Sequence, residues 1–264
     1  MKAKGLLSLL ALSEKRRDIL FMLQEEPKTL KEIRDYFKIT SPEIIPQIRK
    51  LEKENLIIQK DKKYILTEVG EIVTKSFGQF FKTLKIFENN MDFWKEHNIR
   101  GIPEEFQMRL YELEDFKILE STPTEIFKPH DEYIKNLLKS KRIRGVSPAL
   151  HPEYPQSVTM LAEKGADISI VVTRDVFKKL QTKYRKEVQK YLGFGNASFW
   201  MCDEDIKVAF TTSDKFLSMR LFLNDGNYDF YKNIISYEKS ALKWGEDLFS
   251  YYEKRSKKIG AQDF

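Results

Sequence analysis

The first 66 residues contain an order of helix and strand signals that restricts the fold more than any other part of the chain. Ser13 is suited to cap a helix that runs to about Glu26, where Pro27 ends it because proline cannot continue the backbone hydrogen bonds. The segment Thr29–Glu32 has the spacing of a capping box and begins a second helix that reaches about Phe37. We therefore expect two short helices joined by a turn.

A third helix and a β-hairpin follow. Ser41 and Pro42, a capping residue and a first-turn proline, open the helix, and apolar residues at i, i+4 and i+7 give it a buried face. Two short β-type runs then flank the basic turn 60–63. This order of elements predicts a winged helix-turn-helix. The apolar helix positions are Ile44, Ile48 and Leu51, and the two runs are Leu56–Gln59 and Tyr64–Leu66.

Two phrases in this region are more specific than the element order. They resemble the ArsR-like winged helices of archaeal and bacterial regulators. The sequence departs from that pattern at Pro46, which removes a backbone donor in the middle of the third helix. The phrases are Ile48-x-x-Leu51-Glu52-x-x-x-Leu56-Ile57 and Tyr64-x-Leu66-Thr67-x-x-Gly70.

The third helix is the element that enters the major groove in helix-turn-helix proteins, with its N-terminal half nearest the base edges. Burial of its apolar stripe leaves a basic outer face, and the hairpin carries lysines at its tip. An ordinary solvated face of Lys and Arg would have the same composition. We predict base-edge contacts by Ser41 and Gln47, a base or phosphate contact by Arg49, and phosphate contacts by Lys50, Lys53, Lys62 and Lys63.

The charge distribution favours a polyanionic partner for this region. The chain has 264 residues and a formal net charge of +6. Residues 1–66 hold 15 Lys and Arg against 10 Asp and Glu, whereas the rest of the chain holds 31 against 30. The basic excess therefore lies in the first quarter of the chain, as expected for a module that binds double-stranded DNA, although a well-solvated surface would also account for it.

A long helix is expected from Thr67 to about His97. Its large apolar residues recur at alternating spacings of four and three, which is a heptad seam. Such a seam serves equally for packing within the chain and for a homodimer interface. The residues that we predict for dimerisation are Phe77, Phe80, Leu84, Phe87 and Met91.

Beyond residue 98 strand-like and helix-like segments alternate, which predicts an α/β domain with a mixed sheet whose antiparallel part comes late in the chain. The chain is then α+β overall, with a winged helix-turn-helix over 1–66, a linker and dimerisation helix over 67–97, and an α/β effector domain over 98–264. Specific expectations for that domain are one helix over Asp175–Leu192, a hairpin of Ala197–Cys202 with Ile206–Thr212, and a terminal helix over Tyr237–Lys257.

Several unusual phrases in the second domain occur in an order that resembles the two-domain winged-helix regulators of methanogenic archaea, whose effector domain is similar to the middle domain of the methanogen filament-formation sensory regulators. The resemblance implies a dimeric transcriptional regulator of methanogen metabolism. It also implies a phospholipase-D-like fold for the second domain. The phrases are Gly101-Ile102-Pro103, Ile126-Phe127-Lys128-Pro129-His130, Gly145-Val146-Ser147-Pro148, His151-Pro152-Glu153-Tyr154-Pro155, Lys207-Val208-Ala209-Phe210, Phe216-Leu217-Ser218 and Trp244-Gly245-Glu246-x-Leu248-Phe249.

No catalytic signature accompanies that resemblance. Phospholipase-D chemistry needs a histidine nucleophile with a lysine two residues further on, and none of the three histidines, His97, His130 and His151, has one. Cys202 lies in an apolar run and is expected to be a buried small hydrophobe, and it is the only cysteine, so no disulfide can form within the chain. We therefore expect no catalysis, no cofactor and no metal site.

A small-molecule effector site is expected in the loop 147–155, because it follows the C-terminal end of a strand, where α/β sheets bind ligands. Ser147, His151 and Tyr154 are its candidate residues, although the prolines there could equally serve as rigid turn scaffolding. The apolar run Leu6–Leu12 is short for a signal peptide, and no other run could cross a bilayer, so a cytoplasmic protein without membrane contact is expected. The alternatives are a winged-helix adaptor for protein contacts and a phosphodiesterase-like enzyme.

Overall fold

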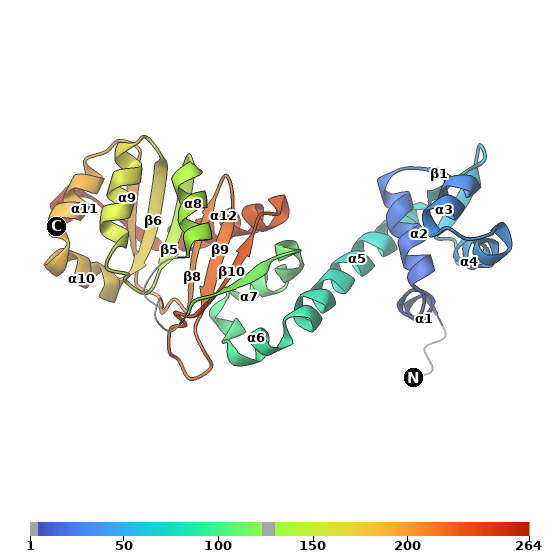
Figure 1. Cartoon of the computed structure of the whole chain (residues 1–264), viewed down its shortest axis with the longest axis horizontal. Coiled ribbons are helices and arrows are strands. Elements are labelled where there is room, and N and C mark those ends of the chain that lie inside the picture. Colours follow the sequence, from blue (N-terminus) through green and yellow to red (C-terminus); the bar gives the residue numbers. More distant parts are fainter. Residues whose placement is uncertain (1–4, 123–129, 264) are drawn as a thin grey trace. The chain divides into compact units, whose positions relative to one another are not determined.

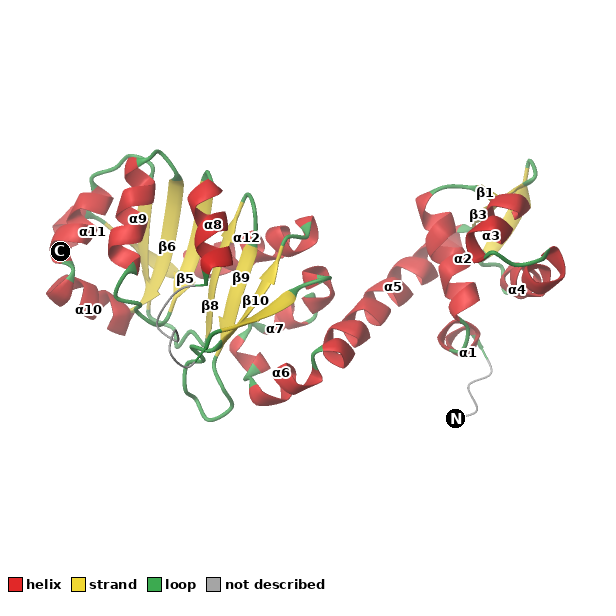
Figure 2. Ribbon diagram, in the orientation of Figure 1, coloured by secondary structure: helices red, strands yellow, loops and turns green. Residues whose placement is uncertain are grey.

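The computed structural model of the chain describes residues 5–122 and 130–263 (Figure 1). Most of the phrase Ile126–His130 therefore lies outside the described residues. The chain divides into two compact units, an N-terminal unit of residues 1–84 and a C-terminal unit of residues 85–264. Both contain helices and strands, which confirms the α+β class (Figure 2).

The N-terminal unit has the element order of a winged helix-turn-helix, as predicted. Its three short strands form a sheet in the order β1-β3-β2, and its helices enclose a single apolar core. Helix α5 begins in this unit and ends in the C-terminal unit. The elements are α1 (Leu6–Ala11), α2 (Glu14–Glu25), β1 (Lys28–Thr29), α3 (Leu30–Phe37), α4 (Ser41–Lys53), β2 (Ile57–Lys60), β3 (Lys63–Leu66) and α5 (Glu68–Asn89).

The starts of α2 and α3 are formed by the predicted caps. The Ser13 hydroxyl accepts a hydrogen bond from the Arg16 backbone N–H at 3.4 Å, which satisfies a donor at the start of α2. Thr29 and Glu32 form the capping box of α3, in which the Glu32 carboxylate accepts from the Thr29 N–H at 2.7 Å. Helix α1 was not predicted, and its Leu10 is buried in the core of the unit.

The hairpin of β2 and β3 turns over two residues. Asp61 and Lys62 have φ of 49° and 63°, as a two-residue type I′ turn requires at both central positions. Lys60 pairs with Lys63 across the turn, so the tip of the wing is basic, as predicted.

Thr67 and Gly70 join the hairpin to α5. The Thr67 hydroxyl donates to the Asn55 carbonyl at 2.6 Å and accepts from the Gly70 N–H at 2.9 Å. A Cβ on Gly70 would lie 1.8 Å from the Leu56 carbonyl oxygen, so only glycine allows the helix to approach this closely. This contact gives a physical reason for the Tyr64-x-Leu66-Thr67-x-x-Gly70 phrase.

The C-terminal unit is built on an eight-stranded mixed sheet in the order β11-β7-β6-β5-β8-β9-β10-β4. Strands β5, β6 and β7 are parallel, and the other pairings are antiparallel, which confirms the mixed α/β sheet with antiparallel strands late in the chain. The strands are β4 (Lys117–Glu120), β5 (Arg142–Ser147), β6 (Asp167–Thr173), β7 (Ala197–Cys202), β8 (Val208–Ser213), β9 (Leu217–Leu221), β10 (Lys232–Ser236) and β11 (Ser256–Ile259).

Helices cover both faces of this sheet and make two separate cores. One core contains buried residues of α8 to α11, and the other contains buried residues of α6, α7 and α12 (Figures 1 and 2). The helical segments are α6 (Met91–Glu96), a 3₁₀ turn (Ile99–Gly101), α7 (Glu104–Gln107), a 3₁₀ turn (Leu110–Leu113), α8 (Asp131–Lys139), α9 (Tyr154–Glu163), α10 (Arg174–Lys183), α11 (Arg185–Leu192), α12 (Lys239–Glu253) and a 3₁₀ turn (Ala261–Asp263).

The predicted hairpin of Ala197–Cys202 with Ile206–Thr212 is wrong. Both neighbours of β7 are already taken by β6 and β11, and β8 pairs instead with β5 and β9. The acidic residues between the two strands bind separate basic partners. Asp203 pairs with Arg174 at 2.7 Å, Glu204 with Arg255 at 3.7 Å and Asp205 with Lys207 at 2.9 Å.

Three predicted helices are shorter or divided. The helix expected to reach His97 breaks at Asn90, after which the Trp94 indole N–H donates back to the Ile86 carbonyl at 3.0 Å and is buried in the sheet core. The helix predicted over Asp175–Leu192 divides at Tyr184. The terminal helix ends at Glu253, because Ser256–Ile259 pairs with β7 as an edge strand.

Replacing Gly70 with alanine should destabilise the N-terminal unit by about 1–3 kcal/mol, because the added methyl group overlaps the Leu56 carbonyl oxygen and the start of α5 must move. Chemical denaturation of the full chain measures this. Gly195→Ala is the control, since a Cβ there meets nothing within 4 Å. Equal stability of the two variants would contradict the close approach.

Candidate nucleic-acid interface and effector cavity

Helix α4 has one buried face and one exposed basic face. The apolar stripe predicted from the sequence is buried, with Ile44, Ile48 and Leu51 each at most 1% exposed. Pro46 is exposed, and the helix continues through it as a single element from Ser41 to Lys53. The outer face therefore stays available along the whole helix.

The start of α4 differs from the sequence-based expectation by one residue. Thr40, not Ser41, is the N-cap, and its backbone N–H and hydroxyl donate to Glu43 Oε2 at 2.9 and 2.7 Å. These hydrogen bonds from the Thr40 N–H and hydroxyl lower the pKa of the Glu43 carboxyl. Ser41 occupies the first helical position and is partly exposed, at the end of the helix where base contacts are predicted.

Gln47 is partly engaged within the protein. Its side-chain carbonyl accepts a hydrogen bond from Arg16 Nη1 at 2.8 Å, and Arg16 Nε donates to the Leu9 carbonyl at 2.5 Å. This chain of contacts ties α4 to α2 and α1. It leaves the amide nitrogen of Gln47, a donor, for any contact with a base edge.

The basic residues of α4 and the wing are all exposed. Within residues 5–122 and 130–263 none of them forms an ion pair with an acidic side chain, so their charges are available to an external anion. Lys60 also lies at the wing tip, although it was not among the predicted DNA contacts. Its position in the basic turn is the sequence feature that could have indicated it. The exposed set is Arg49, Lys50, Lys53, Lys60, Lys62 and Lys63.

The five predicted dimerisation residues fall into two groups. Phe77 and Phe87 are partly buried against the apolar cores of their own units, and Phe87 lies 5.4 Å from the Trp94 ring. The other three side chains are exposed. Their exposed fractions are 52% for Phe80, 39% for Leu84 and 42% for Met91.

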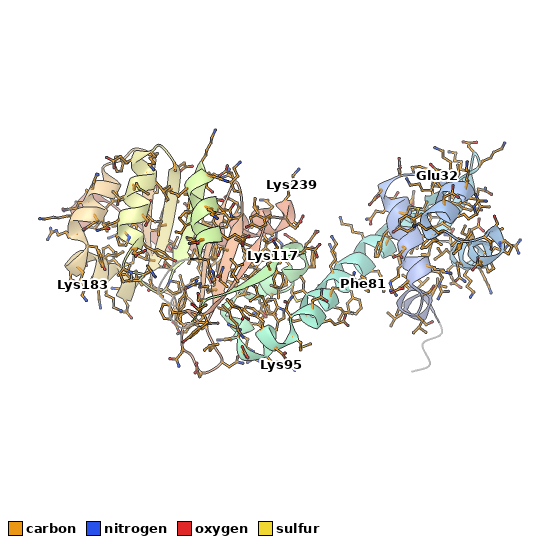
Figure 3. The ribbon with its side chains drawn as sticks, in the orientation of Figure 1. Glu32, Phe81, Lys95, Lys117, Lys183 and Lys239 are labelled. Carbon is orange, nitrogen blue, oxygen red and sulfur yellow. The ribbon has the colours of Figure 1, made fainter. Side chains whose placement is uncertain are left out.

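Two further apolar side chains of α5 are exposed in the N-terminal unit, Val69 at 46% and Ile72 at 69%. Phe81, labelled in Figure 3, lies instead beneath the Arg17 guanidinium at 4.8 Å and stacks on Phe77. Helix α5 thus has one face that packs on the chain and another that is apolar and exposed.

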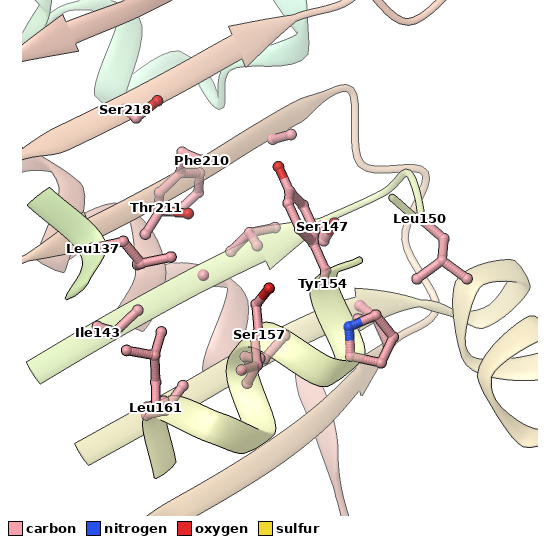
Figure 4. A pocket seen from close by; sticks show the side chains of 18 of the residues that line it. Leu137, Ile143, Ser147, Leu150, Tyr154, Ser157, Leu161, Phe210, Thr211 and Ser218 are labelled. Carbon is pink, nitrogen blue, oxygen red and sulfur yellow. The ribbon is translucent and has the colours of Figure 1, made fainter. Parts of the chain in front are cut away.

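A cavity of about 140 Å³ lies between the sheet and helices α8 and α9 of the C-terminal unit (Figure 4). It opens over small residues of the sheet, since Gly145 on β5 and Ala209 on β8 face it. A Cβ on Gly145 would meet only the Phe210 carbonyl oxygen, at 3.9 Å. The small size of the residues at these two positions therefore leaves space for the cavity.

Two of the three predicted effector residues line this cavity. Ser147 lies at the end of β5 and Tyr154 at the start of α9, and Figure 4 shows the Tyr154 ring reaching toward the strands. His151 is not among the lining residues. Its Nδ1 accepts a hydrogen bond from the Glu153 N–H at 3.3 Å, and its ring lies 4.9 Å from the Tyr154 ring.

The polar lining of the cavity includes residues that the sequence did not indicate. Arg220 on β9 and Asn233 on β10 both face it, together with Tyr133 of α8 and Tyr228 of the loop before β10. Arg220, Tyr228 and Asn233 come from consecutive elements, whereas Tyr133 comes from a helix much earlier in the chain, and no local motif marks any of them.

The histidines differ in their surroundings: His130 lines the cavity, with its Nε2 3.2 Å from Ser121 Oγ, whereas His97 serves local structure. His97 is buried, with Nδ1 2.6 Å from the Phe93 carbonyl and Nε2 2.9 Å from Asp229 Oδ2. Burial opposes ionisation of Asp229, but hydrogen bonds from His97 and from two backbone N–H groups outweigh it and lower the pKa of that carboxyl. Among the described residues no cluster of His, Cys, Asp or Glu could hold a metal ion, and no helix is long and apolar enough to span a bilayer.

The fold and these sites define a two-domain winged-helix protein, with a winged helix-turn-helix and a cavity-bearing α/β domain. Residues 4–85 match the family described as the N-terminal domain of the methanogenesis regulatory protein FilR1, and residues 126–255 match the family of its middle domain. The chain belongs to this FilR1 family of archaeal two-domain winged-helix regulators.

A methanogenesis regulatory protein FilR1 of Methanothrix harundinacea (strain 6Ac) is 27% identical over 257 residues, which are 96% of this chain. The chain spans 58% of that relative's length.

Two solved structures are similar over much of the chain. One is TrmBL2, an archaeal chromatin protein described as having a novel mode of DNA binding, with 13% identity, a TM-score of 0.44 and coverage of 93% of this chain and 92% of that one. The other is a phospholipase D family member, Nuc from Salmonella typhimurium, with 10% identity, a TM-score of 0.38 and coverage of 55% and 98%. Both TM-scores lie below 0.5, so the fold assignment depends on the topology of the chain itself.

Proposed function

We propose that the chain is a cytoplasmic transcriptional regulator that binds double-stranded DNA through α4 and the β2–β3 wing. The observation that carries this proposal is the set of six exposed, unpaired basic side chains on these two elements, among the residues that the structure describes. Phosphates supply most of the affinity in such complexes, while base edges supply specificity. The relationship to a methanogenesis regulatory protein supports a role in the control of methanogen metabolism.

Helix α4 continues through Pro46 without a break, and this favours DNA binding over the alternative of a protein-binding adaptor. An adaptor was suggested by Pro46, since a kink there would turn the helix away from the groove. Pro46 instead lies on the exposed side of a continuous helix, where its missing N–H removes one backbone hydrogen bond without ending the element. Mobility shifts on DNA upstream of its own gene at two salt concentrations separate the alternatives. A DNA-binding protein loses affinity steeply with salt, whereas an adaptor binds no fragment even at low salt.

We further propose that the protein acts as a homodimer through the exposed face of α5. Large apolar side chains on a helix surface are unfavourable in water, and a second copy of the same face would cover them. Phe80 and Leu84 are central to this face, whereas Met91, the third exposed residue of the predicted seam, lies in α6 of the C-terminal unit. A small-molecule effector bound in the C-terminal cavity would then modulate DNA binding by the dimer.

Arg49→Ala should weaken binding to the preferred DNA by about 1–3 kcal/mol, with the loss concentrated at one base position, if Arg49 makes a bidentate base contact. Lys62→Ala and Lys63→Ala should weaken all sequences alike, because a short lysine-tipped hairpin mostly meets phosphates. Each lysine variant should also reduce the salt dependence by about one ion. Quantitative mobility shifts on single-base variants of the site measure all three.

Lys239→Ala, an exposed lysine at the start of α12 (Figure 3), is the charge-matched control and should leave DNA affinity unchanged. If Arg49→Ala lowers the affinity for all DNA sequences equally, sequence specificity must come from Ser41, Gln47 or DNA shape instead. Wing variants that bind like the unaltered chain would exclude the wing from the interface.

Phe80→Asp and Leu84→Asp should each give a folded monomer with much weaker DNA binding. Both side chains are exposed within one chain, so the fold should tolerate the change, whereas a buried unpaired carboxylate between two copies costs about 3–5 kcal/mol. Sedimentation equilibrium with circular dichroism measures mass and fold. Lys75→Asp, also exposed on α5, is the control and should remain dimeric. Folded dimers of both seam variants would place the interface elsewhere.

A further inference from the structure

The cavity of the C-terminal unit has an apolar body and a cationic end. Its aliphatic wall is formed by Leu137 of α8, Leu161 of α9 and Ile143 of β5, all labelled in Figure 4. The strands β9 and β10 contribute the polar side. We propose that this cavity binds a small organic acid, with its carboxylate at the Arg220 guanidinium and its apolar body against the aliphatic wall.

Arg220 carries the argument for an acid. Along β9 the side chains of Leu217, Met219 and Leu221 enter the core on the opposite face, so Ser218 and Arg220 face the cavity. Within the described residues Arg220 forms no ion pair. Its side chain makes a hydrogen bond with the Tyr228 hydroxyl. The guanidinium is partly buried, and a partly buried charge without a counterion is unfavourable. A ligand carboxylate would supply that counterion.

Asn233 gives a second, independent sign of a ligand. It is 1% exposed and lines the cavity, and its Nδ2 donates to Ser218 Oγ at 3.1 Å. Its carbonyl oxygen Oδ1 has no hydrogen-bond partner among the described residues. A buried acceptor without a donor is destabilising, so a ligand hydroxyl or N–H at this position would be favourable. The favoured acid therefore also carries a donor group.

The tyrosines of the cavity complete the polar end. The Tyr133 hydroxyl is already 3.1 Å from Thr211 Oγ1, whereas the Tyr154 hydroxyl has no protein partner among the described residues. Burial raises the pKa of Tyr154, although the nearby Arg220 charge opposes this, so its hydroxyl stays protonated and can donate to an acid. Arg220 and Tyr154 thus provide donors from the sheet and from α9.

The size of the cavity limits the ligand. Its volume of about 140 Å³ is close to that of an engineered apolar cavity of roughly 150 Å³ that binds benzene. An apolar body of about six carbon atoms fits this space, which a nucleotide would exceed. Benzoate, 4-hydroxybenzoate and hexanoate are therefore suitable probes of the class.

This inference deepens the proposed function, because the acid would be the effector of the regulator, but binding of the acid can be measured without DNA. Titration calorimetry of the full chain should detect 4-hydroxybenzoate, benzoate and hexanoate. Benzyl alcohol and hexanol, which lack the carboxylate, should bind about ten- to a hundredfold more weakly, since a hydrogen bond to a charged group is lost. Inorganic phosphate, which lacks the apolar body, should also bind more weakly than the acids. Failure of all three acids to bind, or equal binding of the alcohols, would overturn the proposal.

Variants of the chain test the placement of the acid. Arg220→Gln should weaken benzoate binding about ten- to a hundredfold, and Arg220→Lys should restore part of it. Gly145→Leu should abolish binding by filling the cavity, since its Cβ position is open. Arg174→Gln, an exposed arginine paired with Asp203 outside the cavity, is the control and should bind benzoate normally. Normal binding to Arg220→Gln or Gly145→Leu would contradict the site.

Mobility shifts with and without benzoate then separate this inference from the proposed function. A change of DNA affinity in the unaltered chain that is absent in Gly145→Leu supports both. Acid binding with unchanged DNA affinity retains the acid site but contradicts its role as an effector. A chain that binds the acid and no DNA retains the site and overturns the proposed function.

Discussion

The contact of Thr67 and Gly70 with the end of α4 and the hairpin determines how the N-terminal unit is arranged. Thr67 donates to the Asn55 carbonyl and accepts from the Gly70 N–H, while Gly70 lies against the Leu56 carbonyl. The segment after α4, the hairpin and the start of α5 therefore meet within a few residues. This junction places both of the surfaces that we propose for function within the unit. One surface is the basic face formed by α4 and the wing, and the other is the apolar face of α5.

Sequence reasoning was most successful where structure is decided locally. One capping box, at Thr29 and Glu32, a first-turn proline and a core stripe of Ile44, Ile48 and Leu51 predicted the winged helix-turn-helix, because each acts within one or two helical turns. It failed where the partner is distant. The strands β7 and β8 follow one another in the chain, but the sheet inserts β6 and β5 between them, and nothing near Cys202 indicates that choice.

The residues of the cavity also show that contacts between distant elements cannot be predicted from the sequence. Ser147 and Tyr154 could be anticipated, because the ends of parallel strands in α/β sheets are common ligand positions. Arg220 and Asn233 could not, since their significance comes from the pairing of β9 and β10 beside β8 and from small residues on β5 and β8. Alternation along β9 places Arg220 on the cavity side, and only the assembled sheet shows that no acidic side chain among the described residues accompanies it.

In the proposed complex a dimer presents two copies of α4 and the wing to duplex DNA. Hydroxyl-radical footprinting of the full chain on DNA upstream of its own gene tests this most directly. A dimer should protect two half-sites whose centres lie about 10 base pairs, one helical turn, or a multiple of this apart. A single protected half-site would contradict the dimer, and no protection at low salt would contradict DNA binding by the winged helix.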